Sequence, residues 1–451
     1  MYSRDAISQL KEWAESDHRK PLIVRGARQV GKTSVVKEFG RSFENFIYVN
    51  LEDKIYRDIF DNFVNLDYLL VQLYALNGKP IRKGKTLIFF DEIQNSAEAI
   101  KQLRYFYEDK PEIYVIAAGS LLETLINVHL SFPVGRVQYM AMHPCSFREF
   151  LVATGSEHIR RYIEEHPEHA SAFHDTLMSA FRSYMLVGGM PEAVAMFVET
   201  KDVLSLDGIY ESLLRSYRDD VEKYARNNSQ GAIIRFIIDK GWTQVASKIT
   251  LGKFAGSEYR AREMGEAFRT LERAYLLELV YPNSNTIPPV LPQHTRAPKL
   301  IWLDVGLVNY AANIRKDIFV ASDVVDVWRG AIAEQVVAQE LLTLSDNVNA
   351  QRYFWSRPKS DAEVDFEYMF EGKVVPIEVK SGHNAKLLSL HEFMDSCNHD
   401  VAVRVWSKPY QVDRVKTKSG KEFSLLNVPF YMVGFLPRIL SEFIPAVEMK
   451  F

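Results

Sequence analysis

Residues 26–33 read Gly26-Ala27-Arg28-Gln29-Val30-Gly31-Lys32-Thr33, and this stretch determines the fold expected for the N-terminal third of the chain. The octet matches Gly-x-x-x-x-Gly-Lys-[Ser/Thr], a turn whose backbone N–H groups cradle phosphate oxygens at the start of a helix. The apolar residues 22–24 before it predict a strand, and residues 34–39, closed by Gly40, predict the helix. Lys32 would contact the β- and γ-phosphates, and the Thr33 hydroxyl would bind Mg²⁺. The sequence therefore predicts an ATP site whose binding residues are Gly26, Ala27, Arg28, Gln29, Val30, Gly31, Lys32, Thr33 and Ser34.

The second half of such a site is expected at the end of the apolar run 86–90, which leads into Asp91 and Glu92. An unbroken apolar run ending in carboxylates is typical of a buried parallel strand with chemistry at its C-terminal tip. Asp91 would hold Mg²⁺, and Glu92 would orient and activate the attacking water. A core strand followed by a helix-capping Asp is the alternative, and the phosphate-binding turn upstream makes it the less favoured one.

Two further residues are candidates for contact with the phosphates. Ser120 follows the buried strand expected at 113–119 and would sense the γ-phosphate or its water; capping the next helix explains it equally well. Arg136 would neutralise transition-state charge as an arginine finger, although a lone arginine is usually a surface side chain.

Several short motifs follow one another in a fixed order: Gly-Ala-Arg-Gln-Val-Gly-Lys-Thr at 26–33, Asp-Glu-Ile-Gln at 91–94, Ala-Gly-Ser at 118–120, Gly-Arg at 135–136, Pro-Cys-Ser-Phe-Arg-Glu-Phe at 144–150 and Val-Gly-Gly-Met-Pro-Glu-Ala at 187–193. Together they resemble a family of prokaryotic AAA+ ATPases with a C-terminal domain of unknown function, over residues 3–380. The resemblance gives Lys32, Thr33, Asp91 and Glu92 the roles above and makes Arg136 the arginine-finger candidate. In related signal-transducing ATPases a Gly-x-Pro turn contacts the adenine, which implies that role for Gly189 and Pro191; a helix-breaking turn is the alternative.

The bulk properties fit a globular chain of about three domains. Hydrophobic residues make up 47% and charged residues 25%, and the net charge of -3 gives no global attraction to nucleic acid or membrane. The two cysteines lie far apart in sequence, which fits a reducing cytosol. No signal peptide and no apolar run long enough to span a bilayer is apparent, so a cytoplasmic protein is expected.

The middle of the chain is expected to be helical. Residues 155–225 predict a helical lid, and the short helices that follow, with a hairpin at 290–303, resemble a winged helix, which the family usually has here. On the helix from Arg262 to Leu277, three arginines fall on one face. They would contact DNA phosphates, or they form a solvated face balanced by neighbouring glutamates. These residues are Arg262, Arg269 and Arg273, with Glu263, Glu266 and Glu272.

The C-terminal third carries a second candidate site. Strands 362–370 and 374–380 join through Glu371-Gly372, a two-residue turn that would place Asp365 opposite Glu378. Like charges facing each other destabilise a sheet, so a cation such as Mg²⁺ or Lys380 is expected between them. Alternation would put Val364, Phe366 and Tyr368 on one face and Asp365, Glu378 and Lys380 on the other.

This arrangement resembles the Asp…Glu-x-Lys site of PD-(D/E)xK nucleases. There the carboxylates hold Mg²⁺ and the lysine positions or activates water. The resemblance makes Asp365, Glu378 and Lys380 catalytic candidates and Glu334, on an amphipathic helix beginning at 330, a third metal ligand. A solvated hairpin face is the alternative. A late basic loop either follows a phosphate backbone or is ordinary surface; it contains Lys408, Arg414, Lys416, Lys418 and Lys421.

The sequence thus predicts an α/β chain of four parts. These are a P-loop AAA+ core at 1–150 with helices on both faces of a parallel sheet, a helical lid at 151–226, a winged-helix-like part at 227–315 and a PD-(D/E)xK-like α/β domain at 316–451. We expect a Mg²⁺-dependent ATP-hydrolysing switch that binds ATP and ADP, acts on DNA, does not enter a membrane and can form homo-oligomers. A non-cleaving sensor or scaffold for DNA or a protein is the rival interpretation.

Overall fold

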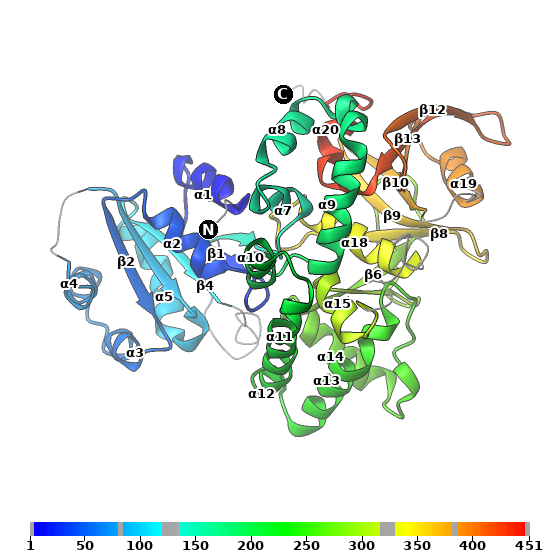
Figure 1. The fold of residues 1–451 in the computed structure, drawn as a ribbon. Coiled ribbons are helices and arrows are strands. Elements are labelled where there is room, and N and C mark those ends of the chain that lie inside the picture. The colour runs from blue at the N-terminus through cyan, green and yellow to red at the C-terminus, as the bar shows by residue number, and fades with distance from the viewer. Residues whose placement is uncertain are drawn as a thin grey trace.

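The computed structural model describes residues 4–79, 84–119, 133, 135–315, 330–380 and 387–446, and the structural statements below concern these residues. Two β-sheets lie on opposite sides of a layer of helices (Figure 1). Ser120, with its expected phosphate-sensing role, lies outside the described residues. No helix in the described ranges is long and apolar enough to cross a membrane.

The N-terminal sheet has five parallel strands in the order β2-β3-β4-β1-β5. Its strands are β1 (Leu22–Arg25), β2 (Asn45–Asn50), β3 (Thr86–Asp91), β4 (Tyr114–Ala118) and β5 (Gln138–Ala141). The expected parallel sheet is therefore confirmed. Because all strands run in the same direction, the C-terminal tips of β1 and β3 meet at one edge of the sheet.

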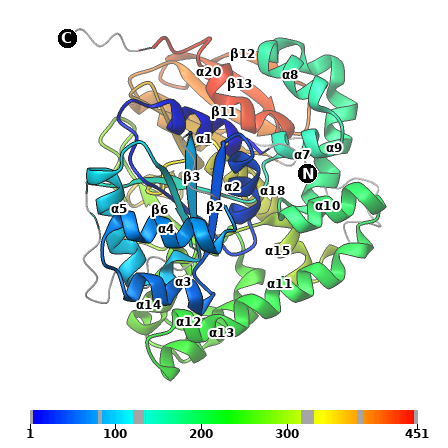
Figure 2. The ribbon, with the colours of Figure 1, turned by 90° about the vertical axis from the view of Figure 1, so that its left-hand side faces the viewer.

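Helices cover both faces of this sheet. The first face packs against α1 (Ala6–Glu15) and α2 (Lys32–Gly40), and the second against α3 (Lys54–Asp61), α4 (Leu66–Leu76) and α5 (Ala97–Asp109). Figure 2 shows α3 and α4 of this second group toward the viewer, with α5 at the left of the strands. Alternate residues of β3 enter the two cores, Leu87 and Phe89 into the first and Ile88 and Phe90 into the second. Burial on both faces explains why the strand is an unbroken apolar run.

The helical region follows. Its α-helices are α7 (Phe147–Ala153), α8 (Glu157–Glu165), α9 (His174–Val187), α10 (Pro191–Thr200), α11 (Asp207–Asp219), α12 (Val221–Tyr224), α13 (Asn228–Lys240) and α14 (Ala261–Arg273). Its 3₁₀ turns are η2 (Pro167–Phe173), η3 (Leu204–Leu206), η4 (Gly241–Gln244) and η5 (Phe254–Gly256). The turn η1 (Ile93–Asn95) precedes this region and follows β3. The first helix, α7, begins with a capping box between Ser146 and Glu149. The helical region expected from 155 to 225 is confirmed.

The C-terminal sheet has eight strands of mixed direction in the order β12-β13-β11-β10-β9-β8-β6-β7. Its strands are β6 (Leu277–Asn283), β7 (Lys299–Trp302), β8 (Tyr353–Ser356), β9 (Glu363–Phe370), β10 (Lys373–Val379), β11 (Val401–Trp406), β12 (Gln411–Lys416) and β13 (Glu422–Pro429). The helices beside it are α15 (Val305–Ala311), α18 (Gly330–Leu342), α19 (Leu388–Ser396), η6 (Phe430–Phe435) and α20 (Leu436–Leu440).

The hairpin expected at 290–303 is shorter in the structure than predicted, and its strand pairs with a different segment of the chain. Only Lys299–Trp302 forms a strand there, and its antiparallel partner is β6. Prolines at 288, 289 and 292 lack the N–H that a ladder requires. The parallel pairing of β6 with β8 makes the pair part of the C-terminal sheet rather than a separate wing.

The register expected between β9 and β10 is confirmed, from Lys373 opposite Phe370 to Ile377 opposite Phe366. The expected alternation is wrong at Val364. The β8–β9 ladder shifts register between Tyr353 and Trp355, and Val364 joins the core beneath α19 while Phe366 joins the main core. A bulge of this kind re-aims the side chains beside it, including that of Asp365.

Candidate functional site

The phosphate-binding turn joins β1 to α2, as the motif requires. Gly31 has φ of 96° and Gly26 has φ of 155°, and a Cβ added to Gly26 would lie 2.1 Å from the backbone oxygen of Met142. Both positions therefore require glycine. Gln29, with φ of 66°, is a third left-handed residue within the turn. The turn is a compact backbone cradle at a helix N-terminus, which fits a bound phosphate group.

Lys32 lies inside this turn, with only 7% of the residue exposed. Its Nζ donates to the carbonyl oxygens of Gly26 and Ala27 at 3.0 and 2.8 Å. Burial lowers its pKa to about 8, against the opposing effect of the Glu92 and Asp91 carboxylates. The ammonium is held inside the turn by these two carbonyl oxygens, within reach of the charges of Asp91 at the end of β3 and of Glu92 directly after it.

Asp91 ends β3 and is hydrogen-bonded to the turn itself. The Thr33 hydroxyl donates to Asp91 Oδ2 at 2.8 Å, and the Tyr48 hydroxyl donates to the same oxygen at 3.0 Å. Thr33 and Asp91 together fit a magnesium ion, which would polarise the phosphates of a bound nucleotide. The sequence analysis missed Tyr48. The one available signal was its place on a strand that could neighbour β3.

Glu92 has φ of 51° and ψ of 45°, a left-handed conformation that is rare for a residue with a Cβ. Its carboxylate accepts a hydrogen bond from the side chain of Gln94. Strained backbone of this kind persists where the surrounding structure enforces it, and such residues concentrate at active sites. Glu92 directly follows β3 and is close enough to Lys32 for its carboxylate to oppose the lowering of the Lys32 pKa.

The Gly189–Pro191 segment lies against the phosphate turn. A Cβ built on Gly31 would lie 3.5 Å from Pro191 Cγ, whereas one on Gly189 would lie 2.2 Å from the Cys145 carbonyl oxygen. The helical region also reaches the turn through an ion pair between Arg28 and Asp220. The structure thus brings Pro191 and Asp220 to the phosphate turn.

Arg136 lies elsewhere. It precedes β5 by two residues and therefore lies at the N-terminal edge of the sheet, opposite to the edge that carries the phosphate turn. Its Nε pairs with Glu108 Oε1 at 3.1 Å. Arg136 therefore does not join the phosphate site of its own chain.

In the C-terminal sheet the carboxylates surround a lysine that the sequence analysis did not identify. Lys299 Nζ lies 2.8 Å from Glu334 Oε2, 3.1 Å from Glu363 Oε1 and 3.4 Å from Asp365 Oδ1. Lys380 Nζ pairs instead with Glu378 Oε1 at 2.5 Å, and Asp365 Oδ2 accepts from the Val379 amide at 2.8 Å. Asp365 and Glu378 therefore do not share one cation: Asp365 pairs with Lys299 of β7, and Glu378 pairs with Lys380.

The electrostatics of this cluster follow from burial. Burial and the Asp365 charge raise the pKa of both Glu334 and Glu378 to about 7. Burial alone would lower the pKa of Lys299, but the carboxylates of Glu334, Asp365 and Glu363 outweigh it and raise the pKa above its usual value. The lysine is therefore held charged and the acids compete for protons.

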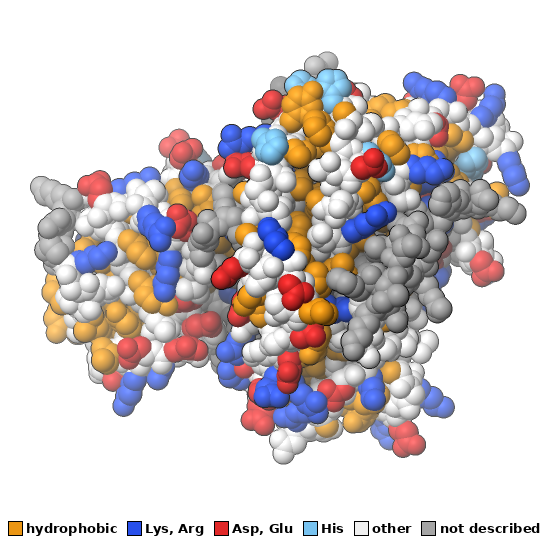
Figure 3. All heavy atoms as spheres, in the orientation of Figure 1, with side chains coloured by type: hydrophobic (Ala, Val, Ile, Leu, Met, Phe, Trp, Pro, Cys, Tyr) orange, Lys and Arg blue, Asp and Glu red, His pale blue; other side chains and the backbone are white. Residues whose placement is uncertain are grey.

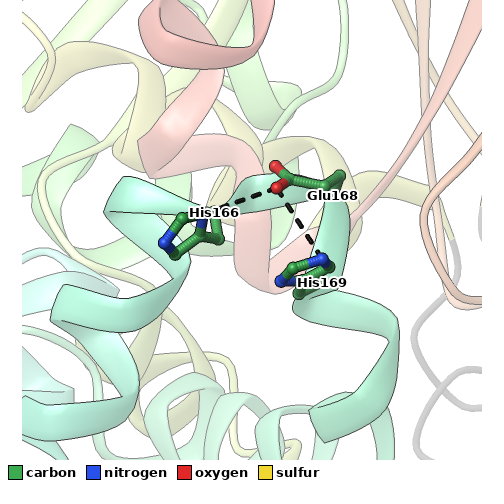
Figure 4. A group of neighbouring side chains, drawn as sticks. All are labelled: His166, Glu168 and His169. Atoms are coloured by element: carbon green, nitrogen blue, oxygen red, sulfur yellow. Dashed lines mark ion pairs between the residues drawn. The ribbon is translucent and has the colours of Figure 1, made fainter.

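Only one set of three His, Cys, Asp or Glu side chains in the described ranges has its ligand atoms within 4.8 Å of one another, and it is His166, Glu168 and His169. Glu168 lies between the two imidazoles on the exposed turn after α8, with Oε1 3.5 Å from His166 Nδ1 and 3.8 Å from His169 Nε2 (Figure 4). The expected ligands Glu334, Asp365 and Glu378 do not converge in this way.

A buried polar network links the two halves of the molecule. Glu340 Oε1, on α18, accepts from the Phe147 amide at 2.9 Å and from the Tyr184 hydroxyl at 2.8 Å. Gln339, beside it, donates to Asp304 Oδ2 at 3.3 Å, and that oxygen also accepts from the Gly189 amide at 2.5 Å. The turn that meets the phosphate site is therefore connected by hydrogen bonds to a helix of the C-terminal part.

Three segments match models of known families. Residues 18–151 match the AAA domain, residues 178–318 a domain of unknown function (DUF8612) and residues 329–430 another domain of unknown function (DUF4143). No curated protein matches the chain.

Solved structures with a similar arrangement include the Walker-type ATPase PABY2304 of Pyrococcus abyssi, at 16% identity and a TM-score of 0.39 over 69% of this chain and 96% of that one. The ORC1 protein of Aeropyrum pernix, solved in complex with DNA, has 12% identity and a TM-score of 0.27 over 71% of this chain and 95% of that one. A signal transduction ATPase with numerous domains, PH0952 of Pyrococcus horikoshii, has 13% identity and a TM-score of 0.27 over 74% and 44%. These TM-scores are low, and the assignment rests on the family models. The chain therefore carries an AAA ATPase domain at residues 18–151, followed by two domains of unknown function.

Proposed function

We propose that this chain is a Mg²⁺-dependent ATPase that works as a molecular switch. The observation that carries the proposal is the hydrogen bond from Thr33 to Asp91, which joins the phosphate turn to the acidic tip of β3. Thr33 and Asp91 hold Mg²⁺, and Lys32 balances the charge of the phosphates. Glu92 orients the attacking water and accepts its proton.

Three further roles are part of the proposal. Tyr48 positions Asp91 through the hydrogen bond to Oδ2. Gly189 and Pro191 contact the adenine from the lid side, and Ser120 senses the γ-phosphate. Arg136 acts as an arginine finger in the site of a neighbouring copy, because it lies at the far edge of its own sheet. This last role requires a homo-oligomer.

The test of this proposal is nucleotide binding and phosphate release by the wild type and by Lys32→Ala. Lys32 makes its hydrogen bonds within the turn, so removing it should leave the fold intact and abolish ATP binding. The matched control is Arg41→Ala just after the same helix, whose exposed side chain pairs with Glu38. Equal ATP turnover by the wild type and Lys32→Ala would overturn the proposal.

The nucleotide state reaches the C-terminal part through the lid. Gly189, Asp304 and Gln339 form a continuous path of hydrogen bonds from the adenine side to α18. The proposed domain order is that of the sequence analysis, except that α13 and α14 belong to the helical region and the β6–β7 pair belongs to the C-terminal sheet. The order α18, β8, β9, β10, α19, β11 is the αβββαβ arrangement of a PD-(D/E)xK-like fold.

DNA is the proposed partner, and a protein partner of a non-cleaving scaffold is the alternative. Arg269 and Arg273 of α14 line a cavity of about 650 Å³, whereas Arg262 pairs with Glu266. In the late basic loop, Lys421 donates to the carbonyl oxygens of Met394 and Cys397 and is therefore structural. Acidic and basic side chains are interspersed at the lower end of the helical layer (Figure 3), so contact with DNA would be local.

The DNA proposal is tested by ATP turnover with and without double-stranded DNA. Stimulation that Arg269→Ala/Arg273→Ala abolishes would support it. The same stimulation in that double variant would assign the DNA contact to residues other than Arg269 and Arg273. No effect of DNA at several salt concentrations would favour the protein partner.

A further inference from the structure

Lys299 is held rigidly at the centre of the C-terminal carboxylates. It is the first residue of β7, its backbone pairs with Val280 of β6, and only 3% of the residue is exposed. Its ammonium lies between Glu334 of α18 and Glu363 and Asp365 of β9, and 5.1 Å from the ring centroid of Phe354. The ammonium is therefore almost completely shielded from solvent and is paired with three carboxylates.

Magnesium does not fit these residues while Lys299 is in place. Mg²⁺ takes carboxylate oxygens at about 2.1 Å in a near-octahedral arrangement. An ion shared by Glu334 and Asp365 would have to occupy the space between oxygens that already lie 2.8 and 3.4 Å from Lys299 Nζ. Two cations cannot share that space without strong repulsion. Glu378, the remaining expected ligand, is paired with Lys380.

The local charge is also nearly balanced without a metal. The four carboxylates of the cluster are Glu334, Glu363, Asp365 and Glu378, and the three ammonium groups paired with them are those of Lys248, Lys299 and Lys380. A divalent ion would turn this slightly negative cluster positive. The need for a cation between the acids of β9 and β10 is met from within the chain.

We infer that Lys299 permanently takes the place of the divalent cation, so that the nuclease-like domain neither binds Mg²⁺ nor cleaves DNA. The domain is then a binding module whose acidic centre is a structural ion cluster. This inference does not depend on ATP hydrolysis and goes beyond the proposed switch. It also explains why the lysine comes from β7: the cluster fastens the β6–β7 pair to β9 and α18.

The experiment is mapping of Fe²⁺ binding in the full chain by hydroxyl-radical cleavage. Fe²⁺ with ascorbate and hydrogen peroxide cuts the backbone next to the bound iron, and fragment masses report where it was bound. The wild type should give no cut in β9 or β10. Lys299→Met, which removes the charge and keeps most of the length, should gain cuts beside Asp365 and Glu334 that excess Mg²⁺ suppresses. Lys299→Gln is a second uncharged variant in case Lys299→Met does not fold.

The matched control is Lys248→Met. Lys248 also pairs with Glu363 but makes no ion pair with Glu334 or Asp365, so its loss removes one charge and leaves the centre filled. It should stay uncut at β9, as should Lys299→Arg. A cut beside Asp365 in the wild type would overturn the inference. Absence of a cut in both folded uncharged variants would also overturn it, because Lys299 would then not be what excludes the metal.

Plasmid cleavage is the second measurement. Wild-type protein with Mg²⁺ should leave supercoiled DNA intact in every nucleotide state. Cleavage that Asp365→Ala abolishes and Lys32→Ala retains would overturn the inference while leaving the ATP switch untouched.

Discussion

Glu367, in the C-terminal sheet, makes stability depend on pH. Burial raises its pKa to about 8 against the opposing hydrogen bonds from Asn283 Nδ2 to both carboxylate oxygens. The folded chain therefore keeps a proton that the unfolded chain releases above its ordinary value of 4.5. The resulting stability is fully present below that value and is lost as the pH rises through about 8.

We therefore expect thermal unfolding at a lower temperature at pH 8.5 than at pH 6, and Glu367→Gln to reduce this difference. At the higher pH the variant should be more stable than the wild type by about 1–3 kcal/mol. Glu258→Gln, at an exposed position, is the control and should leave the pH dependence unchanged. An unaltered pH dependence in Glu367→Gln would contradict the account.

The phosphate turn and the strand that ends in Asp91 could be predicted because their motifs are local. The phosphate turn is eight consecutive residues, and Asp91 and Glu92 follow one apolar run. Tyr48 and Lys299 could not be predicted. Their roles depend on which strand lies beside β3 and on a pairing that brings β7 to β9, and neither follows from spacing along the chain. The left-handed conformation of Glu92 leaves no mark in the sequence either.

Among the elements, α18 joins the two halves of the molecule. The expected amphipathic helix is wrong in one respect, because nearly every residue from Ile332 to Leu341 is buried. A helix buried all round can carry polar groups only where each finds a partner. Glu340 has two partners, the Phe147 amide of α7 and the Tyr184 hydroxyl of α9.

Glu340→Ala should cost about 2–3 kcal/mol of stability, because it leaves the Phe147 amide buried without an acceptor, whereas the Tyr184 hydroxyl keeps the Cys145 carbonyl oxygen. Glu340→Gln keeps an acceptor oxygen and should cost about 1 kcal/mol. Urea unfolding followed by circular dichroism measures both. Similar losses in the two variants would mean that packing, and not the hydrogen bonds, fixes α18 to α7.

For the strands, the pairing register could be predicted only where a short turn of known type joins the two partners. The Glu371-Gly372 turn gave the β9–β10 register correctly. The bulge on the other side of β9 reflects pairing with β8, so Val364 was assigned to the wrong face.

Over the whole molecule, the central question is how nucleotide binding at the ATP site is transmitted to the C-terminal sheet. Asp304 accepts from the Gly189 amide with one oxygen and from the Leu307 amide with the other, the second bond capping α15. Asp304→Asn keeps an oxygen for the cap and replaces the one that receives Gly189 with a donor. It is therefore a specific break in the path.

Hydrogen exchange with and without ATP and Mg²⁺ should show the effect. In the wild type, nucleotide should change exchange in the phosphate turn, the lid, α15 and α18. In Asp304→Asn the change should remain in the turn and disappear from α18. An identical response of α18 in both proteins would exclude this path.

The broad architecture of a P-loop sheet, a helical region and a mixed C-terminal sheet was predictable from motif order and periodicity. The place of β6 and β7 in the last sheet was not, because their pairing with β8 spans residues far apart in sequence.

The most direct test of the account is single-turnover hydrolysis of radiolabelled ATP with Mg²⁺, compared between Glu92→Gln and the wild type. The control is Glu52→Gln, which changes a glutamate just after the neighbouring strand β2. The account predicts that Glu92→Gln binds ATP like the wild type and releases phosphate at least about 100-fold more slowly, while Glu52→Gln is unaffected. Phosphate release from Glu92→Gln at the wild-type rate would contradict it.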